Sequence, residues 1–274
     1  MSEQKKDSRF LIDKIFDKIF QMGDGVSEED RATVKKALDK EILEKPFRVA
    51  VIGQSGVGKS TTLNAIFGLK NYTSNLAEGT TEIVEKVFPM RDGFNLSIYD
   101  MPGLNNDEDK DIEYEKLYKQ ILPGCDVIVY VINAHSRDFG EDCRIIKEVV
   151  LPICDENKIK DNLILAINKI DTIGESIDPN DPELKWDVIE NVPTEKLKKA
   201  IKTRLSDIYD KLIDEKLLGE KESLKDHQVV FYSAMFNFNL KPFVMAIAKA
   251  GNRGWIWPAT VGLERVGLWS EAKM

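Results

Sequence analysis

The first stretch of the chain carries hydrophobic residues at helical spacing. Residues 8–20 place seven large apolar side chains on one wide helical face. Ser27 and Asp30 resemble a capping box and predict a second helix over about 28–44. We interpret residues 1–44 as a helical N-terminal arm that packs its apolar faces on the main domain. A partner-binding or membrane-surface arm is the alternative, although the mixed charges of its polar face argue against a membrane.

Beyond residue 45 the pattern changes to short β-branched runs that alternate with helical segments. This alternation is typical of a parallel sheet covered by helices on both faces, so the expected fold class is α/β. The predicted strands are FRVAVIG (47–53), LSIYD (96–100), DVIVYVIN (126–133), NLILAIN (162–168) and VVFYS (229–233). Helices are expected near 59–67, 111–121, 141–150 and 194–217. The run at 81–90 precedes Asp92 and Gly93, and this predicts a hairpin that adds one antiparallel strand to the mainly parallel sheet.

Composition excludes several classes of protein. The 274 residues include 47 acids and 39 bases, a net charge of −8, so a strongly basic nucleic-acid binder is not expected. Three cysteines without a CxxC pair argue against a disulfide framework or a zinc cluster and fit a reducing compartment. Two histidines exclude a His-rich metal site. No apolar run reaches the roughly 18 residues of a membrane span, and a cytoplasmic protein is expected.

Charge is unevenly distributed along the chain. The segments 104–118 and 171–195 are acidic, and the second carries three prolines and is expected to be an inserted loop on the surface. Residues 251–274 form a short C-terminal extension that contains three of the four tryptophans: Trp255, Trp257 and Trp269. We expect these rings to cap the main domain, which spans 45–250, because exposing them would create a large apolar patch. Contact with a partner or a membrane surface is the alternative.

One glycine-rich motif lies between a predicted strand and a predicted helix. GQSGVGKS at 53–60 fits GxxxxGK[ST], in which glycines let backbone N–H groups converge on phosphate oxygens. Lys59 can then reach the β and γ phosphates, the Ser60 hydroxyl can bind magnesium, and the helix adds its positive N-terminus. The motif therefore indicates a nucleoside triphosphate. The residues expected to contact it are Gly53, Gln54, Ser55, Gly56, Val57, Gly58, Lys59, Ser60 and Thr61.

Three shorter motifs follow predicted strands and narrow the choice of nucleotide. In DMPG (100–103), Asp100 can hold magnesium through water and Gly103 can offer its N–H to the γ-phosphate. In NKID (168–171), Asp171 can accept two hydrogen bonds from guanine, whereas adenine presents an acceptor at N1 and would mispair.

The other residues around the base play supporting parts. Asn168 opens the NKID motif, and Lys169 can lay its aliphatic stem over the base. Ser233 and Ala234 end the last predicted strand, where a backbone N–H could meet the guanine O6.

In this order, GQSGVGKS, DMPG, NKID and SA resemble the guanine-nucleotide-binding motifs of the translation-factor class of P-loop GTPases, in particular its Era/TrmE/septin-like branch. The resemblance covers about residues 45–250 and implies a G domain that binds GTP and GDP with Mg²⁺. It also implies that a switch threonine closes on magnesium. Thr80 and Thr81 both lie at the family's distance from Asp100, and we favour Thr81. The resemblance makes Lys59, Thr81 and Gly103 the catalytic groups, and Ser60, Thr81 and Asp100 the metal ligands.

Two departures from related proteins bear on the reaction rate. Leu104 stands where Ras-like relatives carry a water-positioning glutamine, and Gly56 stands where potassium-activated members carry asparagine. The C-terminal extension lacks a GxxG motif, which weighs against an RNA-binding KH domain. We therefore expect slow GTP hydrolysis by a nucleotide-dependent switch or assembly factor, whose site an activating protein could complete. The alternatives are a self-assembling septin-like or immunity-related-like GTPase that pairs across its nucleotide sites, and a nucleotide-binding scaffold with negligible turnover.

Overall fold

The computed structural model describes residues 45–54, 56–67, 85–89, 95–102, 108–136, 139–220, 223–251 and 253, with isolated positions between 27 and 37. Positions 29, 32, 33, 36 and 37 are helical, as predicted for that stretch. Several predicted features lie outside the described residues: the helix over 8–20, the turn at Asp92 and Gly93, and the three tryptophans of the C-terminal extension. Ser55, Thr80, Thr81, Gly103 and Leu104 also lie outside them.

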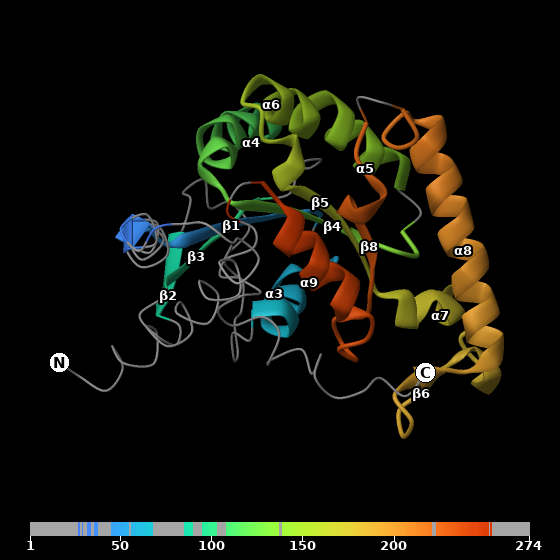
Figure 1. The fold of residues 1–274 in the computed structure, drawn as a ribbon. Helices are drawn as coiled ribbons and strands as arrows, with labels where there is room; N and C mark the ends of the chain where they lie inside the picture. Colours follow the sequence, from blue (N-terminus) through green and yellow to red (C-terminus); the bar gives the residue numbers. More distant parts are fainter. Residues whose placement is uncertain are drawn as a thin grey trace.

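A six-stranded sheet forms the centre of the molecule, with the strand order β2-β3-β1-β4-β5-β8 (Figure 1). Strand β2 pairs antiparallel with β3, and the remaining neighbours pair parallel. The predicted α/β class, with one antiparallel strand in a mainly parallel sheet, is therefore confirmed. The strands are β1 (Phe47–Ile52), β2 (Glu85–Pro89), β3 (Asn95–Asp100), β4 (Val127–Asn133), β5 (Leu163–Asn168) and β8 (Val229–Phe231).

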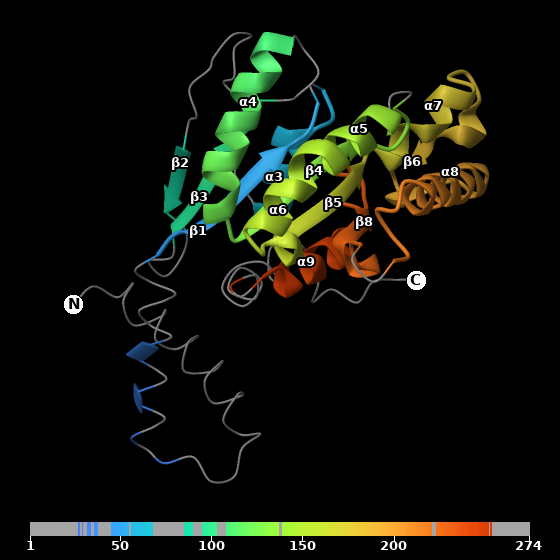
Figure 2. The ribbon, with the colours of Figure 1, turned by 90° about the horizontal axis from the view of Figure 1, so that it is seen from above.

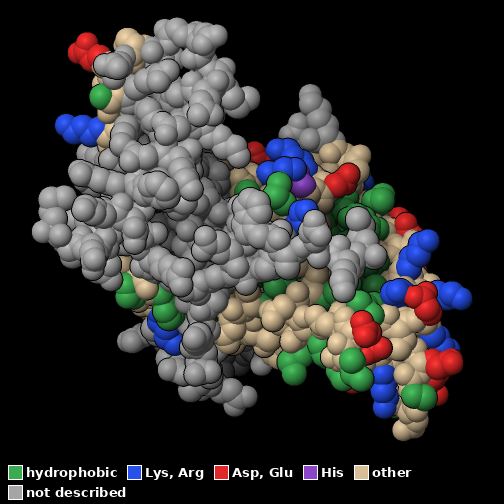
Figure 3. All heavy atoms as spheres, turned by 60° about the horizontal axis from the view of Figure 1, so that its bottom comes forward, with side chains coloured by type: hydrophobic (Ala, Val, Ile, Leu, Met, Phe, Trp, Pro, Cys, Tyr) green, Lys and Arg blue, Asp and Glu red, His purple; other side chains and the backbone are tan. Residues whose placement is uncertain are grey.

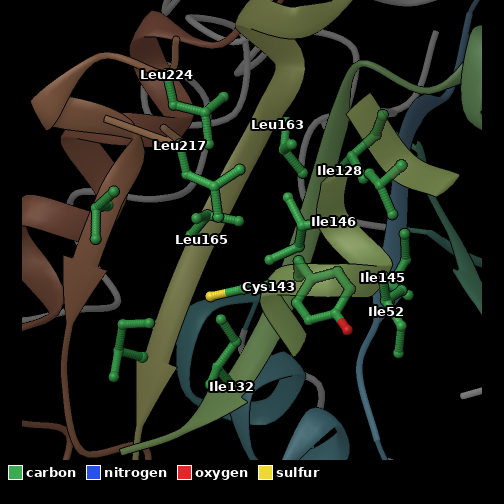
Figure 4. Packing of buried hydrophobic residues seen from close by; sticks show 14 of the residues in the cluster. Ile52, Ile128, Ile132, Cys143, Ile145, Ile146, Leu163, Leu165, Leu217 and Leu224 are labelled. Carbon is green, nitrogen blue, oxygen red and sulfur yellow. The ribbon is translucent and has the colours of Figure 1, made fainter. Parts of the chain in front are cut away.

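Helices cover both faces of the sheet, because alternate strand residues point to opposite sides (Figures 1 and 2). Val49 and Val51 of β1 belong to the cluster that contains helices α3 (Lys59–Phe67) and α9 (Leu240–Lys249). Ala50 and Ile52 belong to the larger cluster on the other face, part of which Figure 4 shows. The helices that contribute to this larger cluster are α4 (Glu108–Ile121), α5 (Phe139–Ile145), α6 (Leu151–Glu156), α7 (Ile173–Ile177) and α8 (Glu195–Asp214).

The helix predicted over 141–150 is longer than expected and contains an irregular turn. Helices α5 and α6 are joined without a break by a π-helical segment, Ile146–Val150, in which the Leu151 N–H bonds to the Ile146 carbonyl. Pro152 follows directly and has no N–H to continue the normal ladder, which explains the wider turn. Short 3-10 turns complete the described backbone at Leu122–Gly124, Lys160–Asn162, Ile170–Thr172, Pro182–Leu184 and Asp226–Gln228.

The acidic segment 171–195 is more ordered than the inserted loop that its composition predicts. It contains α7 and a small antiparallel hairpin of β6 (Trp186–Asp187) and β7 (Val192–Pro193). The hairpin forms because Trp186 packs on two aromatic rings near the end of β8, a tertiary contact that local composition does not reveal. Helix α8 then begins where expected, since the Thr194 hydroxyl accepts a hydrogen bond from the Leu197 N–H.

An ion pair joins the two ends of the described core. The Arg253 guanidinium lies 2.9 Å from Asp126 just before β4, and it also donates to the carbonyls of Lys45 and Pro46 ahead of β1. Asp126 in turn accepts the Arg48 N–H at 2.8 Å. These contacts lie where β1 and β4 begin, opposite the sheet edge at which the motifs gather.

The surface of the described part is mixed in charge. On the face in Figure 3, acidic and basic side chains are interspersed with hydrophobic ones over the coloured part of the molecule. Within the described ranges, no helix combines the length and the apolar character that crossing a bilayer requires.

Candidate nucleotide-binding site

The sequence motifs converge on one edge of the sheet, because the carboxyl ends of its parallel strands lie there. Gly53 follows β1, Met101 follows β3, and Asn168 ends β5. Ser233 lies two residues beyond β8. Open α/β sheets bind ligands at this edge. The described members of all four motifs are thus brought together.

Three glycines of the GQSGVGKS loop have backbone angles that disfavour other residues. Gly53, Gly56 and Gly58 have φ angles of 137°, 75° and 97°. A Cβ on Gly53 would collide with the Val131 carbonyl oxygen, and a Cβ on Gly58 would collide with the Asn168 amide. The loop therefore needs glycine at both positions in order to pack against the neighbouring strands.

Lys59 folds back over its own loop. Its Nζ donates to the carbonyls of Gly53 at 2.9 Å and Gln54 at 3.1 Å. Burial lowers the pKa of Lys59, and the nearby Asp100 carboxylate partly opposes that shift. A buried ammonium held in a glycine-rich loop is well placed to bind an anion.

The side chains that could hold magnesium are oxygen donors on two neighbouring elements. Ser60 lies in the first turn of α3, and Asp100 ends β3 with only 5% of its surface exposed. The described residues include no cluster of three His, Cys, Asp or Glu side chains. Magnesium bound with a nucleotide needs only one or two protein oxygens, since phosphates and waters supply the rest, so this donor set fits the ion.

Asn168 connects the phosphate loop to the loop that follows β8. Its Nδ2 donates to the Val57 carbonyl, and its Oδ1 accepts the Ala234 N–H, both at 3.0 Å. Asn168 is 2% exposed, so both bonds lie in the protein interior. One side chain therefore fixes the spacing between the two loops.

The other NKID side chains lie as guanine binding would require. Lys169 has a left-handed φ of 62°, and its Nζ donates to the Gly56 carbonyl at 2.6 Å, so its stem crosses beside the phosphate loop. The Oδ1 of Asp171 is buried and has no hydrogen-bond partner among the described residues. A buried carboxylate oxygen without a donor is costly, and a base that presents two N–H groups would satisfy it.

The loop after β8 differs in detail from the expected arrangement. The Ala234 N–H, a candidate donor to the guanine O6, is engaged with Asn168. The Ser233 side chain accepts the Phe236 N–H at 3.2 Å, and its backbone exchanges two hydrogen bonds with Phe238. Ser233 therefore closes the loop 233–238, a role that the two-residue motif does not reveal.

A second set of residues near the site was not identified from the sequence. The Arg204 guanidinium of α8 donates to the carbonyls of Ala134 at 2.7 Å and Ser136 at 3.1 Å, and so fixes the turn after β4. Burial lowers the pKa of His135 in that turn, with Lys169 as the next contributor. Both residues line an open groove of about 1100 Å³ between α5, α7 and α8. Only their position near a predicted strand end, or on a predicted helix, could have pointed to them.

Buried polar groups on the neighbouring strands and helices also support the phosphate loop. The Gln54 Nε2 lies 3.5 Å from Asp142, which accepts the Tyr130 hydroxyl at 3.0 Å. The Thr62 hydroxyl donates to the Gly58 carbonyl and pairs at 2.7 Å with the Tyr232 hydroxyl. These hydrogen bonds fix the shape of the loop.

Several known proteins are similar to this part of the chain. The model of the 50S ribosome-binding GTPase family matches residues 48–169. The tRNA modification GTPase MnmE of Mycoplasmoides gallisepticum is 22% identical over 76% of this chain and 44% of its own length. The GTPase Era of Ruminiclostridium cellulolyticum is 30% identical over 46% of this chain and 40% of its own length. For the GTPase Der of Karelsulcia muelleri, the identity is 32% over 45% of this chain and 27% of its own.

One similar solved structure is Era of Aquifex aeolicus bound to GDP.AlF4-, with a TM-score of 0.47 at 25% identity over 75% of this chain and 56% of that chain. The chain spans less than half the length of each of these curated relatives. All three relatives are named as GTPases, so GTP hydrolysis is the activity of the family. The matched stretch of this chain is therefore similar to the G domains of the bacterial P-loop GTPases Era, Der and MnmE.

Proposed function

We propose that this chain binds GTP and GDP with Mg²⁺, hydrolyses GTP slowly, and acts as a nucleotide-dependent switch or assembly factor. The observation that carries the proposal is the pair of hydrogen bonds by which Asn168 links Val57 to Ala234. These bonds hold the phosphate loop and the predicted guanine loop on either side of Asn168. Asp171 follows three residues later, and its buried Oδ1 has no partner among the described residues. One ligand that carries both phosphates and a guanine base fits this arrangement.

Guanine recognition falls to Asp171 and to the backbone of the loop 233–238. The carboxylate accepts the N1–H and the 2-amino group, and the loop backbone beyond Ala234, whose own N–H binds Asn168, would meet the O6. Lys169 supports the base with its aliphatic stem, which the Gly56 carbonyl holds in place.

Phosphate binding falls to Lys59 and the N–H groups of the loop 53–60. Lys59 already sits among loop carbonyls and exchanges part of that contact for the β and γ phosphates. Ser60, Asp100 and Thr81 would hold Mg²⁺, which when bound supplies positive charge against the charge that develops on the phosphates. Gly103 adds its N–H to the γ-phosphate.

Slow turnover follows from two positions. Leu104 cannot orient a water molecule as a glutamine does, and Gly56 offers no side chain to bind potassium. A partner that supplies an arginine can accelerate this chemistry by about a thousandfold or more. The site is therefore arranged for positioning and charge stabilisation of a water attack on the γ-phosphate.

The base-recognition step is tested by Asp171→Asn, with Asp178→Asn on the same acidic segment as the matched control. The amide presents a donor to the guanine donors, so GDP affinity should fall about a hundredfold while xanthosine diphosphate is gained. The control variant should bind GDP like the wild type. Titration with both nucleotides decides the question, and an unchanged GDP affinity of Asp171→Asn would overturn the proposal.

The rate is tested by measuring GTP turnover over a range of protein concentrations, in potassium and in sodium. We expect slow turnover that does not depend on the cation. Specific activity that rises with concentration identifies a second copy as the activator, in line with a self-assembling GTPase. Tight GTP binding with no turnover identifies a scaffold, and rapid turnover by the dilute protein contradicts the proposed rate.

A further inference from the structure

The hairpin β6–β7 packs directly on the loop 233–238. The Trp186 ring stacks on Phe236 with centroids 4.9 Å apart and an interplanar angle of 16°. It also meets Phe238 edge-on at 5.0 Å. Trp186 is 9% exposed and belongs to the larger apolar cluster.

A hydrogen-bond chain runs through the same contact. The Trp186 Nε1 donates to the Asn191 Oδ1 at 3.2 Å, and the Asn191 Nδ2 donates to the Phe236 carbonyl at 3.1 Å. Asn191 has a left-handed φ of 53°, a conformation that asparagine tolerates and most other residues do not. The hairpin turn thus aims one amide at the backbone of the loop.

The loop 233–238 is therefore held from two sides. On its inner side the Ala234 N–H binds Asn168, and on its outer side the Phe236 carbonyl and ring bind the hairpin. Met235, in the part of the loop proposed to meet the guanine O6, lies between these two attachments. Without the outer attachment, the hydrogen bonds that the described residues give this loop are its internal ones and the bond to Asn168.

We propose that the hairpin β6–β7 braces the guanine-recognition loop, with Trp186 and Asn191 as positioning residues that set how long the nucleotide stays bound. The inference rests on the proposed guanine recognition by this loop. Among the described residues, the hydrogen bonds and ring contacts of these two side chains lie within the hairpin and the loop 233–238, so the brace acts on base binding rather than on the reacting phosphates.

The test compares two variants with one control. Asn191→Gly keeps the left-handed backbone and removes both hydrogen bonds, while Trp186→Phe keeps the stacking and removes the donor. Ile189→Ser changes the tip of the same hairpin, where the side chain is 88% exposed, and serves as the control. The measurements are the dissociation rate of fluorescent N-methylanthraniloyl-GDP, kcat at saturating GTP, and hydrogen exchange of the loop 233–238.

We expect Asn191→Gly to release the labelled GDP about fivefold faster, Trp186→Phe to fall between it and the wild type, and Ile189→Ser to match the wild type. Turnover at saturating GTP should change less than about twofold in all three, because the phosphate groups are untouched. Exchange in the loop should rise in Asn191→Gly. Folded variants that release GDP at the wild-type rate, or a loss of thermal stability without faster release, would overturn the inference. A wild type that fails to bind GDP overturns the proposed function instead, and loop exchange then still decides whether the hairpin acts as a brace.

Discussion

The side-chain amide of Asn168 donates to the Val57 carbonyl at 3.0 Å, although the two residues are 111 positions apart. Val57 lies in the phosphate loop between two glycines with positive φ angles. The bond therefore fixes the position of the NKID motif relative to the phosphate loop that follows β1.

The first prediction compares two glycines in that loop. In Gly56→Ala the added Cβ meets no atom within 4 Å, so the substitution is disfavoured only by the φ of 75°, which costs about 1 kcal/mol in the free energy of unfolding. Gly58→Ala has a similar backbone cost because of its positive φ, and its added Cβ would also displace the Asn168 amide. We expect Gly58→Ala to weaken GDP binding at least about tenfold more than Gly56→Ala, as measured by calorimetric titration. Equal affinities would show that Asn168 does not couple the two loops.

Replacing Lys59 should affect nucleotide binding and thermal stability differently. Burial lowers its pKa, so the folded environment disfavours the ammonium at pH 7, and this penalty fades as the pH rises towards the ordinary value of 10.5. Lys59→Met should therefore keep the thermal midpoint of the nucleotide-free protein, or raise it, while binding a GTP analogue about tenfold to a hundredfold more weakly and losing turnover. Thermal unfolding at pH 7 and a binding titration test the two halves. Normal GTP hydrolysis by the variant would show that Lys59 does not bind the phosphates.

The Arg253–Asp126 pair predicts a stability effect far from the site. Arg253→Ala leaves Asp126, of which 10% is exposed, without its guanidinium, and should cost about 3 kcal/mol in the free energy of unfolding. Arg144→Ala, the matched control, breaks ion pairs of an exposed side chain and should cost under about 1 kcal/mol.

Burial raises the pKa of Asp126, and the Arg48 N–H and Arg253 oppose that shift, so the loss in Arg253→Ala should shrink as the pH falls and the carboxyl protonates. Urea unfolding at two pH values measures both effects. Equal losses in the two arginine variants would contradict the assignment.

The three cysteines predict a pH dependence. Burial raises the pKa of the thiols of Cys125, Cys143 and Cys154 to about 12 from an ordinary 9.0. Their reaction with a disulfide reagent at pH 8 should be about a hundredfold slower in the native protein than in denaturant. Above pH 9 the unfolded chain loses these protons before the folded one does, so the free energy of unfolding should fall as the pH rises towards 12. Rapid labelling of the native protein would show that the thiols are accessible.

Most of the sheet could be predicted because both of its faces are buried. The strands from Val127 and Leu163 are apolar almost throughout, which is typical of a parallel sheet covered on both faces. The hairpin β6–β7 could not be predicted from local sequence, because its strands are only two residues long. It is stabilised by the packing of Trp186 on Phe236 and Phe238, which lie some 50 residues later in the chain. The π-helical turn was not predicted either, because Pro152 alters the hydrogen bonding of a helix that remains continuous.

The candidate site divides in the same way. Residues whose chemistry is fixed by local spacing, such as Lys59 and Asp171, were identified from the motifs. Supporting residues, such as Arg204 and Asn191, act through backbone carbonyls that any sequence supplies, so no pattern marks them. The role of Ala234 changed in detail, because its N–H is engaged by Asn168.

The contact between Arg253 and the Lys45 carbonyl, at 3.1 Å, has a topological consequence. The G domain enters and leaves its sheet at one point, 208 residues apart along the chain, and on the side away from the nucleotide. A unit whose entry and exit meet can be inserted into a loop of another protein, or circularly permuted, without parting its strands. The same sheet can therefore serve as a self-contained module within chains of very different length.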